Sequence, residues 1–486
     1  MSDDAAITSA YPYGVASGDV THDQVVLWTK TTPGATVGWS CEPVGGGAAL
    51  TGEASADPTT GAVHAPVTGL TAGTQYRYRF HSDAGATSDA VFKTIPTDRP
   101  VKFAVVSCAK HNSGFFNAYR SVAQMDDIDF VLHLGDYIYE AAEVPTGKQT
   151  AGIDIGRPMD PLGDCMKRED YDKRYALYRR DADLQLLHSR HAMMATIDDH
   201  ELSDNAWLGG AQEHDDAKDG PWADRVHAAM TVWSDWMPTM RRPQDGDAVW
   251  QLIDLGEAGR ILLCETRLAR SNPDDPKSEN KTAMGLKQRA WALGELAKPS
   301  PGWTFLAVPS MLSDLDHAAG DEDAMFALHK LKMAEADSPE SFHDLWDSFD
   351  FEQDALIAAT AKLERAVALS GDVHFSAEHI QDVPAGQFVE WTVTSITSPN
   401  LDDKMGWPRG AESRNYEAAL LRNLPDMKWC DLDSHGYLIV DSSPDRLSCQ
   451  WWFVDTVSKI SDDFTLGHEV VLTAHPEGTL AEDVVP

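Results

Sequence analysis

The chain contains the segment 129-DFVLHLGDYIYE-140, in which a short apolar run is followed at once by a glycine, a carboxylate and two phenols. Such a run is typical of a buried β-strand. The arrangement recurs in 193-MMATIDDHE-201 and 366-AVALSGDVH-374, and a cysteine ends the run 101-VKFAVVSC-108. Because adjacent parallel strands end at the same edge of a sheet, we expect the side chains after these runs to meet.

Carboxylates and imidazoles gathered at strand ends can form a two-metal hydrolytic site. A cysteine at a strand end, such as Cys108, is more often a small buried hydrophobe. Beside Asp136, however, its thiolate would suit a softer or ferric ion. Asp136 and Tyr139 lie three residues apart and can face one ion if the strand ends in a helical turn. Asp372 and His374 flank one residue and point the same way in an extended segment.

These candidates also fit purely structural roles. Asp136 alone suits a helix N-cap, and Asp198–Glu201 suits a surface turn. If that segment is functional, Asp199 is a ligand and His200 contacts the substrate. Arg267 follows a predicted strand, where it would clamp an anionic oxygen or form a helix-capping salt bridge. Four strand-end clusters in order favour a metal site over four unrelated turns.

The length of 486 residues exceeds the size of one hydrophobic core, so we predict two domains, residues 1–98 and 99–486. No apolar stretch is long enough to span a membrane, and Met1–Asp4 does not begin an export signal. The formal charge of −37 argues against a nucleic-acid-binding surface. The six cysteines form no CxxC pair, although a disulfide such as Cys430 with Cys449 stays open.

The pattern of strands and helices changes along the chain. Between residues 12 and 97, short alternating strands such as Val25–Lys30 and Tyr76–Phe80 predict a small β-sandwich. Compact apolar strands then alternate with long helical stretches, one of them around residues 171–190. This alternation predicts an α/β or layered αββα domain.

Ordered motifs extend over nearly the whole chain. They are Gly14–Asp19, Leu27–Thr29, Tyr76–Phe80, Ser107–Cys108, His133–Glu140, Tyr178–Asp181, Asp198–Glu201 with Asn205 and Trp207, Gly371–His374, and Ser395–Pro399. In these motifs the chain resembles the PhoD family of alkaline phosphatases and phosphodiesterases, within the calcineurin-like metallophosphoesterase superfamily. The resemblance implies an α/β fold with a four-layer αββα metallophosphoesterase core, preceded by a small fibronectin-like β-sandwich.

The resemblance also implies a pair of metal ions. The ligands of a ferric ion (Fe3+) would be Cys108, Asp136, Tyr139 and His374. Asp136 would bridge to a second site, where Asp199 and Asp372 are oxygen ligands suited to calcium (Ca2+). Manganese, magnesium and zinc are the alternatives for this second ion.

Three further residues receive roles from the resemblance. His200 would be the catalytic residue, in contact with the phosphoryl oxygens or the leaving group, and Arg267 and Asn205 would bind the substrate. The chain departs from the family at Glu265–Arg267, where we expect an aspartate in place of the glutamate. It also lacks the twin-arginine signal of the family, so a periplasmic or secreted location rests on the resemblance, with the cytoplasm as the alternative.

The expected activity is hydrolysis of a phosphate ester, a phosphodiester or a phosphomonoester, by a metal-activated hydroxide. A phospholipase D-like phosphodiesterase of the same family is the first alternative. A surface- or carbohydrate-binding protein with a degenerate catalytic part is the second. The preferred ester and the oligomeric state are left open by the sequence.

Overall fold

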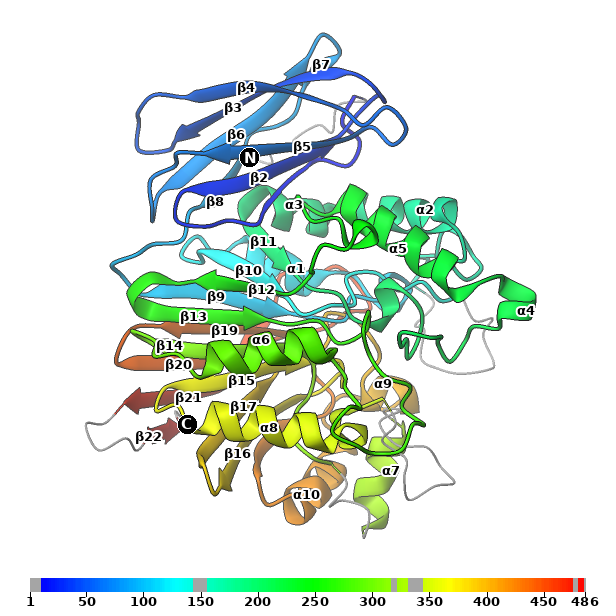
Figure 1. The fold of residues 1–486 in the computed structure, drawn as a ribbon, viewed down its shortest axis with the longest axis vertical. Helices are drawn as coiled ribbons and strands as arrows, with labels where there is room; N and C mark the ends of the chain where they lie inside the picture. Colours follow the sequence, from blue (N-terminus) through cyan, green and yellow to red (C-terminus); the bar gives the residue numbers. More distant parts are fainter. Residues whose placement is uncertain (1–9, 143–154, 316–320, 331–343, 475–479, 485–486) are drawn as a thin grey trace.

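Two large β-sheets form the centre of the molecule in a computed structural model, which describes residues 10–142, 155–315, 321–330, 344–474 and 480–484 (Figure 1). The described part of the first sheet has the order β22-β21-β20-β19-β9-β10-β11-β1-β2-β5, and the second has β12-β13-β14-β15-β17-β16-β18. The first sheet contains β1 (Val15–Gly18), β2 (Gln24–Lys30), β5 (Ala62–Thr68), β9 (Val101–Val106), β10 (Phe130–His133), β11 (Ala192–Ala195), β19 (Gly436–Ser442), β20 (Arg446–Val454), β21 (Phe464–Ala474) and β22 (Leu480–Val484). The second contains β12 (Gln251–Asp254), β13 (Gly259–Leu263), β14 (Trp303–Ser310), β15 (Ala366–Gly371), β16 (Ser376–Val383), β17 (Gly386–Thr392) and β18 (Met427–Asp431).

The two sheets pack face to face, and helices cover their outer faces. Phe103 and Leu132 of the first sheet share one buried core with Phe305 and Leu369 of the second. Side chains alternate along a strand, so the intervening residues of each sheet face helices. The first sheet packs against α1 (Asn117–Ala123), α2 (Arg168–Arg179), α3 (Ala182–Arg190) and α5 (Trp222–Trp236). The second packs against α6 (Leu286–Leu296) and α8 (Asp350–Ala361), and its β16–β18 end against α7 (Glu322–Lys330) and α10 (Ser413–Asn423).

The helical stretch expected around residues 171–190 is two helices rather than one. The chain leaves α2 at Arg180, and Asp181 then starts α3 as its N-cap. The Asp181 carboxylate accepts hydrogen bonds from the backbone N–H groups of Asp183 and Leu184, at 2.9 and 3.1 Å. Aspartate is one of the residues most often found at the N-cap of a helix. The apolar periodicity continues across the break, which explains why the sequence pattern predicts a single helix.

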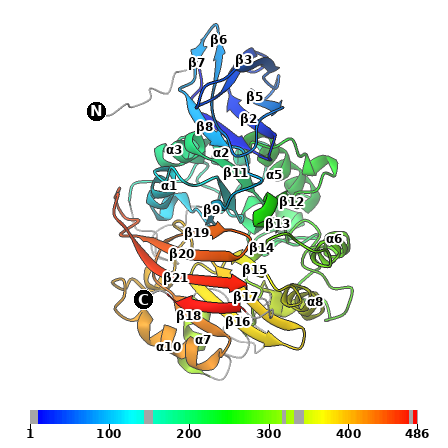
Figure 2. The ribbon, with the colours of Figure 1, turned by 90° about the vertical axis from the view of Figure 1, so that its left-hand side faces the viewer.

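A third, smaller sheet lies at the N-terminal end of the molecule (Figure 2). It contains β3 (Thr36–Pro43), β4 (Leu50–Ser55), β6 (Gln75–Ser82), β7 (Gly85–Ala86) and β8 (Ala90–Lys93). Val37 and Phe80 of this sheet share a buried core with Val25, Leu27 and Val63 of β2 and β5. The α/β fold with an N-terminal β-sandwich is therefore the one expected.

The sandwich is joined to the rest of the molecule by a continuous strand ladder. β1 runs parallel to β11, with Gly18 opposite Met193. A Cβ atom on Gly18 would lie 2.6 Å from the Met193 carbonyl oxygen, so only glycine allows this approach. Next to it, Asp19 Oδ1 accepts a 2.5 Å hydrogen bond from the Arg241 guanidinium. The division at residue 98 stays a prediction, because strands on both sides of it share one sheet.

All six cysteines are buried and free. Cys430 lies in β18 of the second sheet, whereas Cys449 lies in β20 of the first. The disulfide considered between these two residues is therefore absent from the structure.

Candidate metal centre

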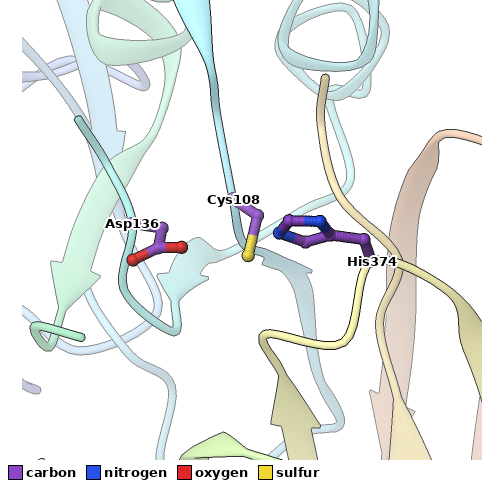
Figure 3. A group of neighbouring side chains, drawn as sticks. All are labelled: Cys108, Asp136 and His374. Carbon is purple, nitrogen blue, oxygen red and sulfur yellow. The ribbon is translucent and has the colours of Figure 1, made fainter. Parts of the chain in front are cut away.

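The strand ends predicted to meet do so at one edge of the two sheets. β9, β10 and β11 are parallel neighbours in the first sheet, and β13, β14 and β15 in the second. Cys108 follows β9, Asp136 follows β10, and His374 follows β15. Their ligand atoms lie within 4.8 Å of one another, and Figure 3 shows the Cys108 sulfur between the other two side chains. Cys108, Asp136 and His374 are therefore placed to share one ion.

The backbone around these residues is strained. Cys108, Asp136, Asp372 and His374 all have positive φ, at 59°, 55°, 72° and 60°. Residues other than glycine seldom adopt such angles, and they concentrate at functional sites. Gly135 completes the turn with a φ of 110°, and a Cβ atom there would lie 2.6 Å from the Asp198 side chain. The strand ends can converge because Gly135 has no side chain.

Tyr139 completes the first group of potential ligands. Its hydroxyl donates a 2.8 Å hydrogen bond to Asp136 Oδ2 and lies 3.2 Å from His374 Nε2. His374 Nδ1 donates to the Pro399 carbonyl at 3.2 Å, which leaves the Nε2 lone pair directed toward the group. Burial and the neighbouring Asp136 raise the pKa of the Cys108 thiol well above its usual value. The neutral thiol of Cys108 is therefore favoured over the thiolate wherever no cation is bound.

A second group consists of carboxylates alone. Asp136, Asp198, Asp199 and Asp372 place oxygens within 4.8 Å of one another. Burial, together with the charge of Asp198, raises the pKa of Asp372 well above its usual value. Asp199 Oδ1 and Asp372 Oδ2 are buried without a hydrogen-bond partner. Buried carboxylate oxygens are rarely left unpaired, and an oxygen-loving cation would satisfy both of them.

His200 borders both groups. Its Nδ1 donates a 2.7 Å hydrogen bond to Glu140 Oε2, and its ring lies 4.0 Å from that of Tyr139, measured between centroids. A ring nitrogen also lies within 4.8 Å of oxygens of Asp136 and Asp199. Burial disfavours the imidazolium, but Asp199, Glu140 and Asp136 outweigh it and raise the pKa of His200 well above its usual value. These carboxylates favour the protonated form of the His200 imidazole.

The two predicted substrate-binding residues lie beside the carboxylate group. Arg267 is fully buried, and its guanidinium donates to Asp198 Oδ1 at 2.5 Å and to Asp344 Oδ1 at 2.6 Å. It also lies 3.8 Å from the unpaired oxygens of Asp199 and Asp372. Asn205 donates its backbone N–H to Asp199 Oδ2 at 2.7 Å. In this structure both residues contact carboxylates, and their contact with a substrate stays a prediction.

Several residues that organise the site received no role from the sequence. Glu201 is buried and accepts backbone N–H hydrogen bonds from Asp136, Tyr137 and Asp198 at 2.6–3.0 Å. Glu140 orients His200. Both glutamates lie inside the motifs quoted above, so the density of acidic residues was the available signal. Asp344, which holds Arg267, carries no local signal at all because it is far away in the sequence.

Comparison with known proteins identifies the family. The sequence model of the PhoD-like phosphatase family matches residues 103–451, and that of the PhoD-like phosphatase N-terminal domain matches residues 2–96. The chain belongs to the PhoD-like phosphatase family. It is accordingly a phosphoric ester hydrolase, and the resemblance noted in the motifs is confirmed.

Two relatives of the PhoD-like phosphatase family show how far the similarity extends. Alkaline phosphatase D of Bacillus subtilis (strain 168) is 26% identical over 485 residues, covering 90% of this chain and 76% of that protein. A solved structure described as the structure of PhoD superposes with a TM-score of 0.83 at 22% identity, covering 99% of this chain and 92% of the other. The latter similarity supports the fold. Among the described residues, no helix has the length and hydrophobicity needed to cross a membrane.

Proposed function

We propose that the protein hydrolyses phosphate esters, phosphodiesters or phosphomonoesters, at a centre of two metal ions. Two buried carboxylate oxygens without a hydrogen-bond partner, Asp199 Oδ1 and Asp372 Oδ2, support this proposal most directly. Burial, followed by repulsion from Asp198, raises the pKa of Asp372, and a bound cation would favour the charged carboxylates of this group. Arg267 supplies only part of the compensating charge, because it also pairs with Asp198 and Asp344.

The residues present fit two chemically different ions. A ferric ion is proposed for the first group because it accepts the thiolate of Cys108, the phenolate of Tyr139 and the imidazole of His374. Calcium, or another hard divalent ion, is proposed for the second, with Asp136, Asp199 and Asp372 as oxygen ligands. Asp136 belongs to both groups of ligand atoms and is therefore the proposed bridge.

When bound, the two ions would lower the pKa of a water molecule and neutralise charge on the phosphoryl oxygens. The residues of the chain then have separate tasks. His200 donates its proton to the departing alkoxide, and Glu140 holds the imidazole ring in place during this transfer. Arg267 holds the carboxylates of Asp199 and Asp372 in position, with its guanidinium 3.8 Å from one oxygen of each.

The proposal is tested by metal analysis of protein purified without added ions, combined with assays after exhaustive chelation. We expect iron in the isolated protein, a visible charge-transfer band from thiolate or phenolate to iron, and loss of activity on chelation. D199N removes the charge of one proposed ligand and should bind calcium more weakly while keeping the band, whereas C108S should alter the band. Full activity in a metal-free, colourless preparation would refute the proposal.

A second candidate, a phospholipase D-like phosphodiesterase, is favoured by a cavity beside the carboxylate group. The cavity has a volume of about 300 Å³ and is lined by Leu202, Trp207, Trp222, Val226, Met230 and Arg267, among others. Its mostly apolar wall suits the alcohol part of a lipid ester. Turnover of phosphatidylcholine should be compared with that of p-nitrophenyl phosphate and bis-p-nitrophenyl phosphate. Preference for the lipid would select this second candidate.

Export from the cytoplasm stays a prediction of the resemblance.

A further inference from the structure

The loop at residues 394–399, which follows β17, encloses the first group of potential ligands from one side. Its backbone N–H groups at Thr397 and Ser398 both donate to the Cys108 carbonyl, at 3.3 and 3.2 Å. Ile396 N–H donates to the neighbouring Ser107 carbonyl at 2.9 Å. The loop therefore fixes the strained backbone that presents the Cys108 sulfur.

The same loop orients His374. The Pro399 carbonyl accepts the Nδ1–H of His374 at 3.2 Å. The Thr394 hydroxyl, which lies 2.7 Å from the Ser434 carbonyl, is also 3.3 Å from the His374 carbonyl. A hydrogen bond to the remote ring nitrogen of a ligand histidine sets its tautomer and its direction. A displacement of this loop would therefore move two proposed ligands of one ion together.

The loop is held in turn by a buried chain of polar groups. The Ser395 hydroxyl donates to the Ser398 carbonyl at 2.6 Å and lies 3.0 Å from His435 Nδ1. On its other side, His435 Nε2 lies 2.8 Å from Asp403 Oδ2. His435 is 7% exposed and Ser395 is not exposed at all. None of these three residues belongs to the metal groups.

The hydrogen-bond partners of His435 determine which of its ring nitrogens carry protons. Because Ser395 gives its only hydroxyl proton to the Ser398 carbonyl, its oxygen can only accept from His435 Nδ1. The carboxylate of Asp403 can likewise only accept from Nε2. Both ring nitrogens therefore carry protons, and the buried His435 forms an ion pair with the half-buried Asp403. Burial opposes this charge, but Asp403 outweighs it and raises the pKa of His435.

We propose that His435, paired with Asp403, is a positioning residue of the metal centre: it fixes the loop at residues 394–399 and, through the loop, the imidazole of His374 and the backbone of Cys108. This role rests on the proposed two-metal function. The chain of contacts from Ser395 through His435 to Asp403 resembles the serine–histidine–aspartate triad of hydrolases, but the geometry differs. Ser395 is inaccessible, and its hydroxyl proton points to a carbonyl rather than to the histidine.

The test compares wild-type protein with H435Q and with a matched control, H468Q. His468 is another largely buried histidine paired with a carboxylate, 3.5 Å from Glu378 Oε2, and its ring stacks on that of Trp429 in β18. The readouts are the rate at which iron passes to a chelator and the position of the visible band. We expect H435Q to lose iron about 10- to 100-fold faster, with a shifted band. H468Q should behave as wild type.

S395A provides a second route to the same question, because it removes the hydroxyl that links His435 to Ser398 and leaves only the 3.3 Å contact of His435 Nδ1 with the Ser395 carbonyl. D403N removes the charge paired with His435 from the other side. If H435Q fails to fold, wild-type iron-loss rates in both S395A and D403N overturn the positioning role. The two proposals also fail differently. Metal-free, active wild-type protein overturns the proposed function together with this role. Iron-loaded wild type beside an H435Q protein with unchanged iron loss and band overturns this role alone.

Discussion

Asp136 shows how much of the candidate site depends on single residues. It has a φ of 55°, follows a glycine with a φ of 110°, and belongs to both groups of ligand atoms. The strain is maintained because Glu201 accepts the backbone N–H of Asp136 at 3.0 Å and that of Tyr137 at 2.6 Å. The hydrogen bonds to Glu201 thus offset the backbone strain that places the Asp136 carboxylate between the two groups of ligands.

G135A should damage this arrangement. A methyl group at this position would lie 2.6 Å from the Asp198 side chain, on a backbone that L-residues rarely adopt. We expect a loss of about 1–3 kcal/mol in unfolding free energy, together with weaker metal binding. Urea denaturation and metal titration measure the two effects. G294A is the control, because Gly294 has no neighbour within 4 Å and lies in α6. Equal effects in both variants would contradict the explanation.

The sequence was sufficient to predict which residues meet, but not how they are held. Cys108, Asp136, Asp372 and His374 all follow apolar strands, and parallel strand ends converge. By contrast, nothing around Asp344 predicts its contact with Arg267, because the two are brought together only by the fold. Positive φ at non-glycine residues leaves no pattern in the sequence either, since the surrounding contacts impose it.

At the scale of elements, apolar runs were a reliable guide and helix ends were not. The strands expected at residues 101–107 and 129–134 correspond to β9 and β10, within one residue at each end. Their runs are short, apolar and bounded, as buried parallel strands require. The break between α2 and α3 depends instead on one side chain. Asp181 caps the start of α3 with its carboxylate, and as an N-cap it has a non-helical backbone, so α2 ends before it.

D181A should show what this cap contributes. The substitution removes two hydrogen bonds to the start of α3 and an ion pair with Arg157 at 2.8 Å. We expect a loss of about 0.5–2 kcal/mol in unfolding free energy, measured by urea denaturation. D181N keeps an oxygen that can cap the helix and loses only the charge. It should therefore be less destabilised than D181A. Because both variants lose the ion pair, equal destabilisation would show that the ion pair matters more than the cap.

At the scale of the whole molecule, buried histidines make stability depend on pH. Burial, followed by nearby positive charge, lowers the pKa of His191 to about 4, and its Nε2 donates to the Val122 carbonyl at 3.1 Å. Unfolding exposes the ring, which then binds a proton below its ordinary pKa of about 6.5. The unfolded state therefore binds more protons than the folded state between pH 4 and 6.5. His191 stabilises the fold fully above this window and less as the pH falls through it.

Comparison of wild type with H191Q isolates this contribution from all other groups. The unfolding free energy of wild type, relative to that of H191Q, should decrease as the pH falls from 6.5 to 4.5. The limiting slope is about 1.4 kcal/mol per pH unit. Urea denaturation at a series of pH values gives both curves. Parallel curves would exclude a role for His191.

Gly18 provides the corresponding test for the junction with the sandwich. G18A would place a methyl group 2.6 Å from the Met193 carbonyl and from the Pro238 ring. We expect a single calorimetric transition in wild type, because one sheet crosses the junction, and a lower melting temperature in G18A. G45A, at a glycine with no neighbour within 4 Å, should leave the transition unchanged. Two separate transitions in wild type would show that the junction is weak.

The same ladder bears on any attempt to express the catalytic part alone. Without residues 1–98, β11 would lose its partner β1 and become the edge of the sheet. An uncovered edge strand offers free N–H and C=O groups to other chains and promotes aggregation. A truncated protein starting near residue 99 should therefore self-associate through β11, even though every proposed ligand is still present. The N-terminal sandwich therefore protects the catalytic part from self-association by covering the β11 edge.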